Sequence, residues 1–118
     1  MRFDNPDRIF SIRTQEEFRK TALEVFQYQA TNNNIYNLFL KSIGKDYRLV
    51  RHLREIPFMP AVFFRSHKVI IENAEVKVVF ESSATTGATP ARHYVHDPKM
   101  YANSFLKNFA IVYGDPSQ

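Results

Sequence analysis

The chain of 118 residues has the length of one small domain, and 44% of its residues are hydrophobic, which is enough for a packed core. Its 11 Phe and 6 Tyr argue against global disorder, because disordered chains are poor in aromatic residues. The absence of cysteine excludes disulfides, thiolate zinc sites and a cysteine nucleophile from these residues. No apolar run is of signal-peptide type or membrane-spanning length, so we expect a cytoplasmic protein without a membrane span.

Positive charge is concentrated in one part of the chain. The formal net charge is +4, and residues 41–68 contain seven basic residues against two acidic ones, a local excess of 7 − 2 = +5. Such a segment attracts nucleic acid, an anionic membrane or a phosphorylated ligand, or it forms a solvated basic face. The sequence leaves both interpretations open. The basic residues are Lys41, Lys45, Arg48, Arg51, Arg54, Arg65 and Lys68.

Two helices are predicted after an irregular arm at residues 1–13. Thr14 followed by Glu17 is a capping box, in which the hydroxyl and the carboxylate each accept a backbone N–H at the helix start. An apolar stripe at helical spacing, Phe18, Ala22, Val25 and Phe26, then predicts an amphipathic helix to about residue 30. The Asn run at 32–34 ends it and supplies a cap for a second helix, which closes at Gly44.

The rest of the chain alternates short elements. Leu49, Leu53 and Ile56 predict weak helix over residues 45–56, and Pro57 and Pro60 end it. The apolar runs 62–64 and 69–71 are short strand candidates, residues 76–80 are a better one, and residues 94–95 are another.

Asp97 and Pro98 then predict the start of a final helix. Its apolar stripe is Tyr101, Phe105, Phe109 and Val112. Helices first, then short strands around a polar loop, then a helix indicate an α+β fold or the opening segment of an α/β fold.

The loop from Ser82 to Pro90 carries the chemistry. It reads Ser-Ser-Ala-Thr-Thr-Gly-Ala-Thr-Pro and directly follows a β-rich run. Hydroxyl and backbone N–H groups donate hydrogen bonds to phosphate oxygens, and a glycine lets the backbone fold around an anion. The chain contains neither a Walker A motif nor G-x-G-x-x-G, and small-residue loops also occur as plain turns.

This loop resembles the Ser/Thr/Gly-rich phosphate loop of adenylate-forming enzymes, S-S/T-G-T-T-G-x-P. Further segments in the same order are similar to the acyl-protein synthetase (LuxE-type) branch over roughly residues 33–114, and phenylacetate–CoA ligases are more distant relatives. These segments are Ile56 to Pro60, Phe63 to Val69, Phe80 to Pro90, Arg92 to Tyr94, and Asp97.

The resemblance implies an ATP-dependent ligase that forms acyl-AMP from a fatty acid and passes the acyl group to a protein thiol, sometimes on a partner protein. It implies that Ser82, Ser83, Thr85, Thr86, Gly87 and Arg92 contact the phosphates of ATP. Ala84 departs from the pattern, because the family has glycine there. If that position requires positive φ, alanine costs about 1 kcal/mol and weakens ATP binding.

Family members are about three times longer than this chain. We therefore interpret residues 1–118 as one region, the N-terminal part of the large adenylation domain. The resemblance places the adenine pocket, the Mg²⁺ ligand, the acyl tunnel and the acceptor cysteine beyond Gln118, so we expect this piece to be inactive alone and to self-associate through apolar surface. No catalytic residue is assigned, and no metal site is expected within the chain.

Three histidines and two phenylalanines are further candidates for function. His93 and His96 are three positions apart, which on an extended chain places them on opposite faces and favours local hydrogen bonding over one metal site. His67 has no adjacent carboxylate for a triad, so we expect a surface or capping role. Phe63 and Phe64 fit core packing better than an acyl site.

A different class of protein also accounts for the basic segment. A small basic module that binds nucleic acid or another phosphorylated partner would use the positive charge of residues 41–68. The chain lacks the aromatic sheet motifs of common RNA-binding domains. A regulatory or oligomerisation domain is a third alternative.

Overall fold

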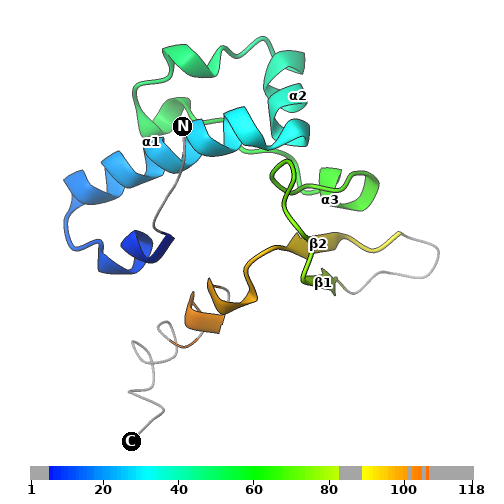
Figure 1. Cartoon of the computed structure of the whole chain (residues 1–118). Helices are drawn as coiled ribbons and strands as arrows, with labels where there is room; N and C mark the ends of the chain where they lie inside the picture. The colour runs from blue at the N-terminus through cyan, green and yellow to red at the C-terminus, as the bar shows by residue number, and fades with distance from the viewer. Residues whose placement is uncertain (1–5, 83–88, 101, 105, 107–118) are drawn as a thin grey trace, which may run out of the picture.

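A computed structural model describes residues 6–82, 89–100, 102–104 and 106 of the chain. The fold is mixed: two packed helices, α1 (Gln15–Asn32) and α2 (Asn34–Ser42), are followed by short turns and by an antiparallel hairpin of β1 (Val78–Glu81) and β2 (Arg92–Val95) (Figure 1). This architecture agrees with the predicted α+β class. A 3-10 turn, η1 (Pro6–Ser11), precedes α1 in the arm.

α1 begins as the sequence predicts, with one difference. The backbone N–H of Glu17 donates to the Thr14 hydroxyl at 3.1 Å, which caps the helix. The Glu17 carboxylate accepts from the backbone N–H of Arg13 at 3.0 Å. A capping box would direct that carboxylate to Thr14 itself. The Glu17 carboxylate therefore accepts from the backbone N–H just before the cap, and it still lies at the positive end of the helix dipole.

Asn33 joins the two helices. Its backbone N–H donates to the carbonyl of Gln29 at 2.9 Å and so ends α1. Its side-chain Oδ1 accepts from the N–H of Tyr36 at 3.2 Å and so caps α2. One asparagine therefore terminates one helix and starts the next, which fixes the turn between them and confirms the predicted break.

α2 ends at a positive-φ glycine, as predicted. Gly44 has φ 70°, its N–H donates to the carbonyl of Lys41, and the N–H of Lys45 donates to the carbonyl of Leu40. These two bonds form a Schellman motif, which satisfies the last carbonyls of the helix.

Residues 45–60 contain only short helical turns. Two 3-10 turns form, η2 (Tyr47–Leu49) and η3 (Leu53–Glu55), in place of the weak helix that was expected. Asp46 caps η2 through the N–H of Arg48, and Glu55 accepts from the N–H groups of Arg51 and His52. Because these carboxylates satisfy the backbone locally, the segment does not extend into a continuous helix.

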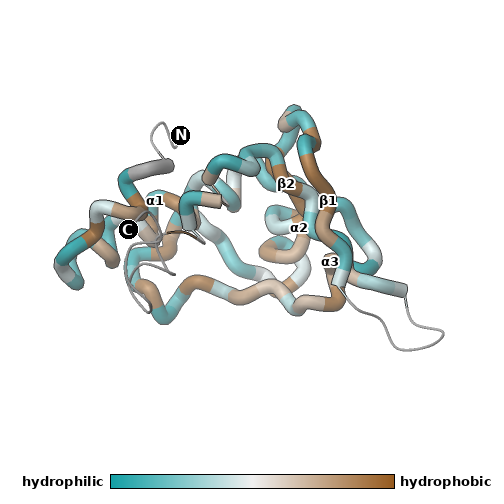
Figure 2. Tube along the Cα trace, turned by 90° about the horizontal axis from the view of Figure 1, so that it is seen from below, coloured by the Kyte–Doolittle hydropathy of each residue, from teal (hydrophilic) through white to brown (hydrophobic). Residues whose placement is uncertain are grey.

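The core lies where α1 and α2 meet this segment. Phe26, Ala30, Leu40 and Val50 are buried, and half-buried Leu23, Tyr36, Phe39, Tyr47 and Ile56 pack against them. The predicted stripe of α1 is therefore buried only in its second half: Phe26 is 4% exposed, whereas Phe18 is 54% exposed. Figure 2 shows the hydrophobic residues recurring along α1 between hydrophilic ones.

The apolar run at residues 62–64 forms a helical turn, so strand is the wrong assignment there. α3 (Phe63–Ser66) follows Pro60, and the N–H groups of Phe63 and Phe64 donate to the carbonyls of Pro60 and Ala61. Proline at the start of a turn has a helical φ and needs no donor, which favours this outcome.

The hairpin forms near the predicted strands. β1 pairs with β2 in the register Val78–Val95, Val79–Tyr94, Phe80–His93 and Glu81–Arg92. β1 begins two residues after the predicted start at Val76, and β2 contains the predicted pair Tyr94-Val95. Ile71 forms a separate bridge with Asn33, which ties the second apolar run to the helix junction.

The final helix is described only at its start. Asp97 accepts from the N–H of Met100 at 3.1 Å, as a cap does, and residues 98–100, 102–104 and 106 are helical. All four residues of the predicted stripe, Tyr101, Phe105, Phe109 and Val112, lie outside the described residues.

Candidate functional site

The hairpin holds both ends of the polar loop. The N–H of Ser82 donates to the carbonyl of Ala91 at 2.9 Å, and the N–H of Ala91 donates to the Ser82 hydroxyl oxygen at 3.1 Å. These bonds continue the β1–β2 ladder by one residue pair. Ser83, Ala84, Thr85, Thr86 and Gly87 lie outside the described residues, so of the six predicted phosphate-binding residues the structure places Ser82 and Arg92.

Ser82 keeps a donor at the mouth of this loop. Its exposed hydroxyl accepts from Ala91, and a hydroxyl both donates and accepts, so its hydrogen remains available to an incoming acceptor. The bond from Ala91 fixes the position of the hydroxyl oxygen at the end of the hairpin.

Arg92 already has a partner. Its Nε donates to Glu81 Oε1 at 2.9 Å across the strand pair, and both side chains are half exposed. The bond to Glu81, followed by the Tyr94 side chain, raises the pKa of the Arg92 guanidinium. A phosphate at this position competes with the Glu81 carboxylate for the guanidinium, a competitor that sequence spacing could not reveal because it depends on register.

Residues 63–68 pack on the hairpin through aromatic contacts. The Phe64 ring lies 4.8 Å from the His93 ring, and Lys68 Nζ lies 5.6 Å from the centre of the Tyr94 ring. The second contact has cation–π geometry. These contacts connect β2, and hence the base of the loop, to the turns that follow the core.

The histidines form local contacts. His96 Nδ1 lies 2.9 Å from the carbonyl oxygen of Glu75, whereas the ring of His93 is tilted by 37° against the ring of Phe64. His67 stacks on Phe63 and its Nδ1 lies 2.7 Å from the Ser66 hydroxyl. Within the described parts of the chain, no group of three or more His, Asp or Glu side chains is placed to hold a metal ion.

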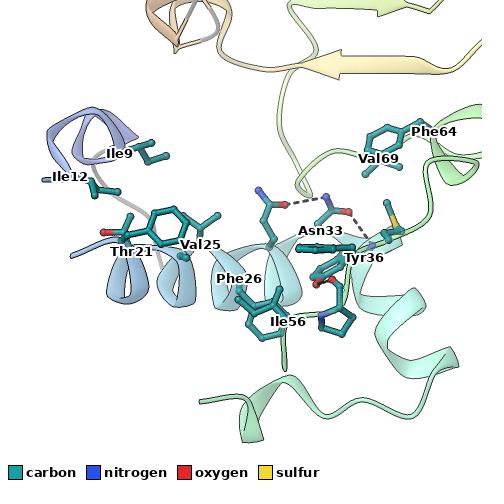
Figure 3. A pocket seen from close by; sticks show the side chains of 16 residues that line it. Ile9, Ile12, Thr21, Val25, Phe26, Asn33, Tyr36, Ile56, Phe64 and Val69 are labelled. Carbon is teal, nitrogen blue, oxygen red and sulfur yellow. Dashed lines mark hydrogen bonds between the residues drawn. The ribbon is translucent and has the colours of Figure 1, made fainter. Parts of the chain in front are cut away.

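An apolar groove that residue spacing does not reveal runs along α1 (Figure 3). Its volume is about 580 Å³, within the range of small-molecule pockets. Phe64 lines it, so this ring contributes to the groove and is not buried in the core. The apolar walls come from residues 9–12, from α1, from residues 56–59 and from residues 64–69. They include Ile9, Ile12, Val25, Phe26, Ile56, Phe58, Met59, Phe64 and Val69.

Few polar groups reach this groove. The Asn33 amide donates to Gln29 Oε1 at 3.1 Å, and the Tyr36 hydroxyl donates to the carbonyl of Pro57 at 2.6 Å. Burial raises the pKa of Tyr36 to about 12. The groove therefore suits an aliphatic or aromatic group. The apolar stripe of α1 and the Ile56 to Pro60 run were its sequence signals, but only folding brings them together.

The chain matches no protein-family model, no curated protein and no solved structure. In the part of the chain that the structure describes, no helix combines the length and the apolar character that crossing a bilayer requires.

Proposed function

We propose that this chain is the N-terminal part of an ATP-dependent fatty-acyl-activating enzyme of the acyl-protein synthetase type. The observation that carries the proposal is the hairpin base at Ser82 and Ala91. It pairs Ser82 with Ala91 on either side of the Ser/Thr/Gly segment, with Arg92 directly after Ala91. Paired strands on both sides fix the ends of a loop and lower the entropy that it loses on binding a ligand.

The proposed role of this loop is to hold the phosphates of ATP. The Ser82 hydroxyl donates to a phosphate oxygen, and Arg92 exchanges its Glu81 partner for phosphate. In the reaction implied by the family resemblance, the fatty-acid carboxylate attacks the α-phosphorus, the bond to the β-phosphate breaks, and acyl-AMP and pyrophosphate form. An acceptor thiol then takes the acyl group and AMP leaves.

The apolar groove supports a substrate with a hydrocarbon chain. Each methylene group moved from water into such a groove contributes about 0.8 kcal/mol. The groove follows α1 from Phe18 to Asn33, fifteen residues at ~1.5 Å each, or roughly 22 Å. One acyl chain spans about half of the ~30 Å hydrocarbon core of a bilayer, so an extended chain fits along this length.

Calorimetric titration of the 118-residue chain with ATP tests the phosphate role. We expect binding by the wild type, and weakening of about threefold to fivefold in Arg92→Gln, the range of an exposed ion pair. Lys77→Gln is the matched control, because Lys77 also pairs with a nearby carboxylate, Glu75 at 3.0 Å, and precedes the same hairpin. Absence of ATP binding by the wild type would overturn the proposal for this loop.

Acyl activation is tested on the protein that the complete reading frame encodes. We expect fatty-acid-dependent exchange of labelled pyrophosphate into ATP by that protein and no exchange by residues 1–118 alone, because catalysis needs both reacting groups held together. Folded protein without acid-dependent exchange contradicts the proposed reaction even if ATP binds. Exchange by residues 1–118 alone contradicts the expected inactivity of this piece.

A further inference from the structure

A second hollow lies between the end of α2 and η2, and no residue of β1 or β2 lines it. Its volume is about 460 Å³, and its wall includes Lys41, Gly44, Lys45, Asp46 and Arg48. Three basic side chains from eight consecutive residues therefore converge on one concave surface. This hollow gives part of the basic segment 41–68 a specific location.

Three of the last four backbone carbonyls of α2 already accept hydrogen bonds. The C-terminus of a helix normally presents free carbonyl oxygens, which repel anions. At α2 the carbonyls of Phe39, Leu40 and Lys41 accept from the N–H groups of Ile43, Lys45 and Gly44. The Schellman motif thus occupies these oxygens, and the lysine side chains set the local charge.

Gly44 leaves space in the wall. Apart from Gly44 and its two chain neighbours, no heavy atom lies within 4 Å of the position that a Cβ would occupy at this residue. A ligand can therefore approach the backbone of the turn closely. Gly44 also has φ 70°, a conformation that favours glycine, so the same residue is needed for the turn and leaves the space open.

The charges in the hollow leave an excess of two cations. Arg48 forms a two-point pair with Asp46, at 3.0 and 3.1 Å, which balances one charge of each sign. Lys41 and Lys45 remain, so three cations minus one carboxylate give 3 − 1 = +2. Glu55 is the other nearby carboxylate: Lys45 contributes to lowering its pKa, after its hydrogen bonds from the backbone of Arg51 and His52.

We infer that this hollow binds a phosphate group, with Lys41 and Lys45 as its charge partners. A phosphate monoester carries about two negative charges near neutral pH, equal to the excess in the hollow. Lysine ammonium groups act as point charges for phosphate and donate up to three hydrogen bonds each. The phosphate belongs either to a soluble ester or to the headgroup of an anionic phospholipid.

The first experiment titrates inorganic phosphate into the isotope-labelled chain at low ionic strength and follows the backbone amide signals of Gly44 and Lys45. We expect saturable shifts, weakened about tenfold in a Lys41→Ala/Lys45→Ala double variant if each pair contributes as an exposed ion pair. The matched control is Lys20→Ala/Lys99→Ala, which removes the same charge from exposed sites elsewhere and should change affinity less than twofold. Far-ultraviolet circular dichroism checks that each variant is folded.

Sedimentation with vesicles separates the two sources of phosphate. Vesicles of phosphatidylcholine with phosphatidylinositol 4-phosphate are compared with phosphatidylcholine alone, for the wild type and both double variants. Lipid-dependent sedimentation lost only in the Lys41/Lys45 variant assigns a headgroup, whereas phosphate binding without sedimentation assigns a soluble ester. Unchanged Gly44 and Lys45 signals, or equal loss of phosphate binding in both double variants, overturn the inference. ATP binding at the hairpin loop is measured separately through Arg92→Gln, so failure of either site leaves the other unaffected.

Discussion

Asn33 takes part in several local structures at once. It is 6% exposed, ends α1, caps α2 and donates from its amide to Gln29. It also bridges to Ile71, which brings the middle of the chain against the helix junction. A buried asparagine with this many partners contributes more to stability than a cap alone, because its loss leaves buried groups without partners.

Asn33→Ala is expected to lower the free energy of unfolding by about 1–3 kcal/mol, the sum of a lost cap and an unpaired buried group. The neighbouring Asn34 is exposed, and Asn34→Ala is expected to change the free energy of unfolding by less than about 0.5 kcal/mol. Urea unfolding followed by circular dichroism measures both. Equal effects of the two substitutions would show that the second helix does not depend on this cap.

The Tyr36 hydroxyl makes stability depend on alkaline pH. Burial raises its pKa from 10.0 to about 12, so the folded state holds this proton more tightly than the unfolded state. Its contribution to stability is therefore complete below pH 10 and is lost as the pH rises from 10 towards 12. Tyr36→Phe is expected to remove this component, and to cost about 1 kcal/mol at neutral pH through the lost bond to the Pro57 carbonyl.

Absorbance titration of tyrosinate tests this expectation, because the Tyr36→Phe variant should lose a late-titrating tyrosine that the wild type contains. Tyr47→Phe is the control, because it removes another half-buried tyrosine that packs against the core. A wild-type titration curve that Tyr36→Phe leaves unchanged in this range would contradict the assigned cause.

Among the secondary-structure elements, the β1–β2 hairpin adjoins the proposed phosphate loop. It is stabilised by backbone pairing and by the cross-strand pair of Glu81 and Arg92. Its register places Glu81 opposite Arg92, and an exposed cross-strand pair of this kind contributes about 0.2–1 kcal/mol. The same pair withholds the guanidinium from an anion. The hairpin is therefore a position where stability and ligand affinity are in competition.

Glu81→Gln is expected to raise the affinity for ATP by about threefold and to lower stability by less than about 1 kcal/mol, because it frees Arg92 at the cost of one exposed ion pair. Glu75→Gln frees Lys77 in the same way before the strand and serves as the control. Calorimetric titration and thermal unfolding measure the two effects. Unchanged or weaker ATP binding in Glu81→Gln would mean that Arg92 does not contact phosphate.

Across the whole molecule, the main feature is apolar surface that the described residues leave open. Phe58 is 90% exposed at the edge of the groove, and Phe18 on α1 is more than half exposed. Large open apolar grooves are typical of surfaces that bind a ligand or another protein surface. If the chain self-associates as expected, this groove is the surface through which we expect the copies to meet.

We expect the isolated chain to associate at micromolar concentration and Phe58→Ser to shift it towards monomer. Leu49→Ser is the matched control, because Leu49 is 70% exposed but does not line the groove. Sedimentation velocity over a concentration series measures the effect. A monomeric wild type, or equal shifts in both variants, would show that the groove does not mediate association.

The positions where helices begin and end follow largely from the amino-acid sequence. The caps at Thr14 and Asp97, a cap from the asparagine run 32–34, the glycine end at Gly44 and a strand at Tyr94-Val95 were predicted, because each depends on residues only a few positions apart. The resemblance to adenylate-forming enzymes also comes from sequence alone and stays a prediction.

Tertiary structure decided which surfaces those elements share. Phe18 and Phe26 belong to one helical stripe, yet only Phe26 is covered, because α2 and the turns after it pack against the second half of α1. The groove combines residues from η1, α1, α2, residues 56–59 and α3. The Glu81–Arg92 pair depends on strand register. These features depend on contacts between residues far apart in the chain, which periodicity and spacing do not encode.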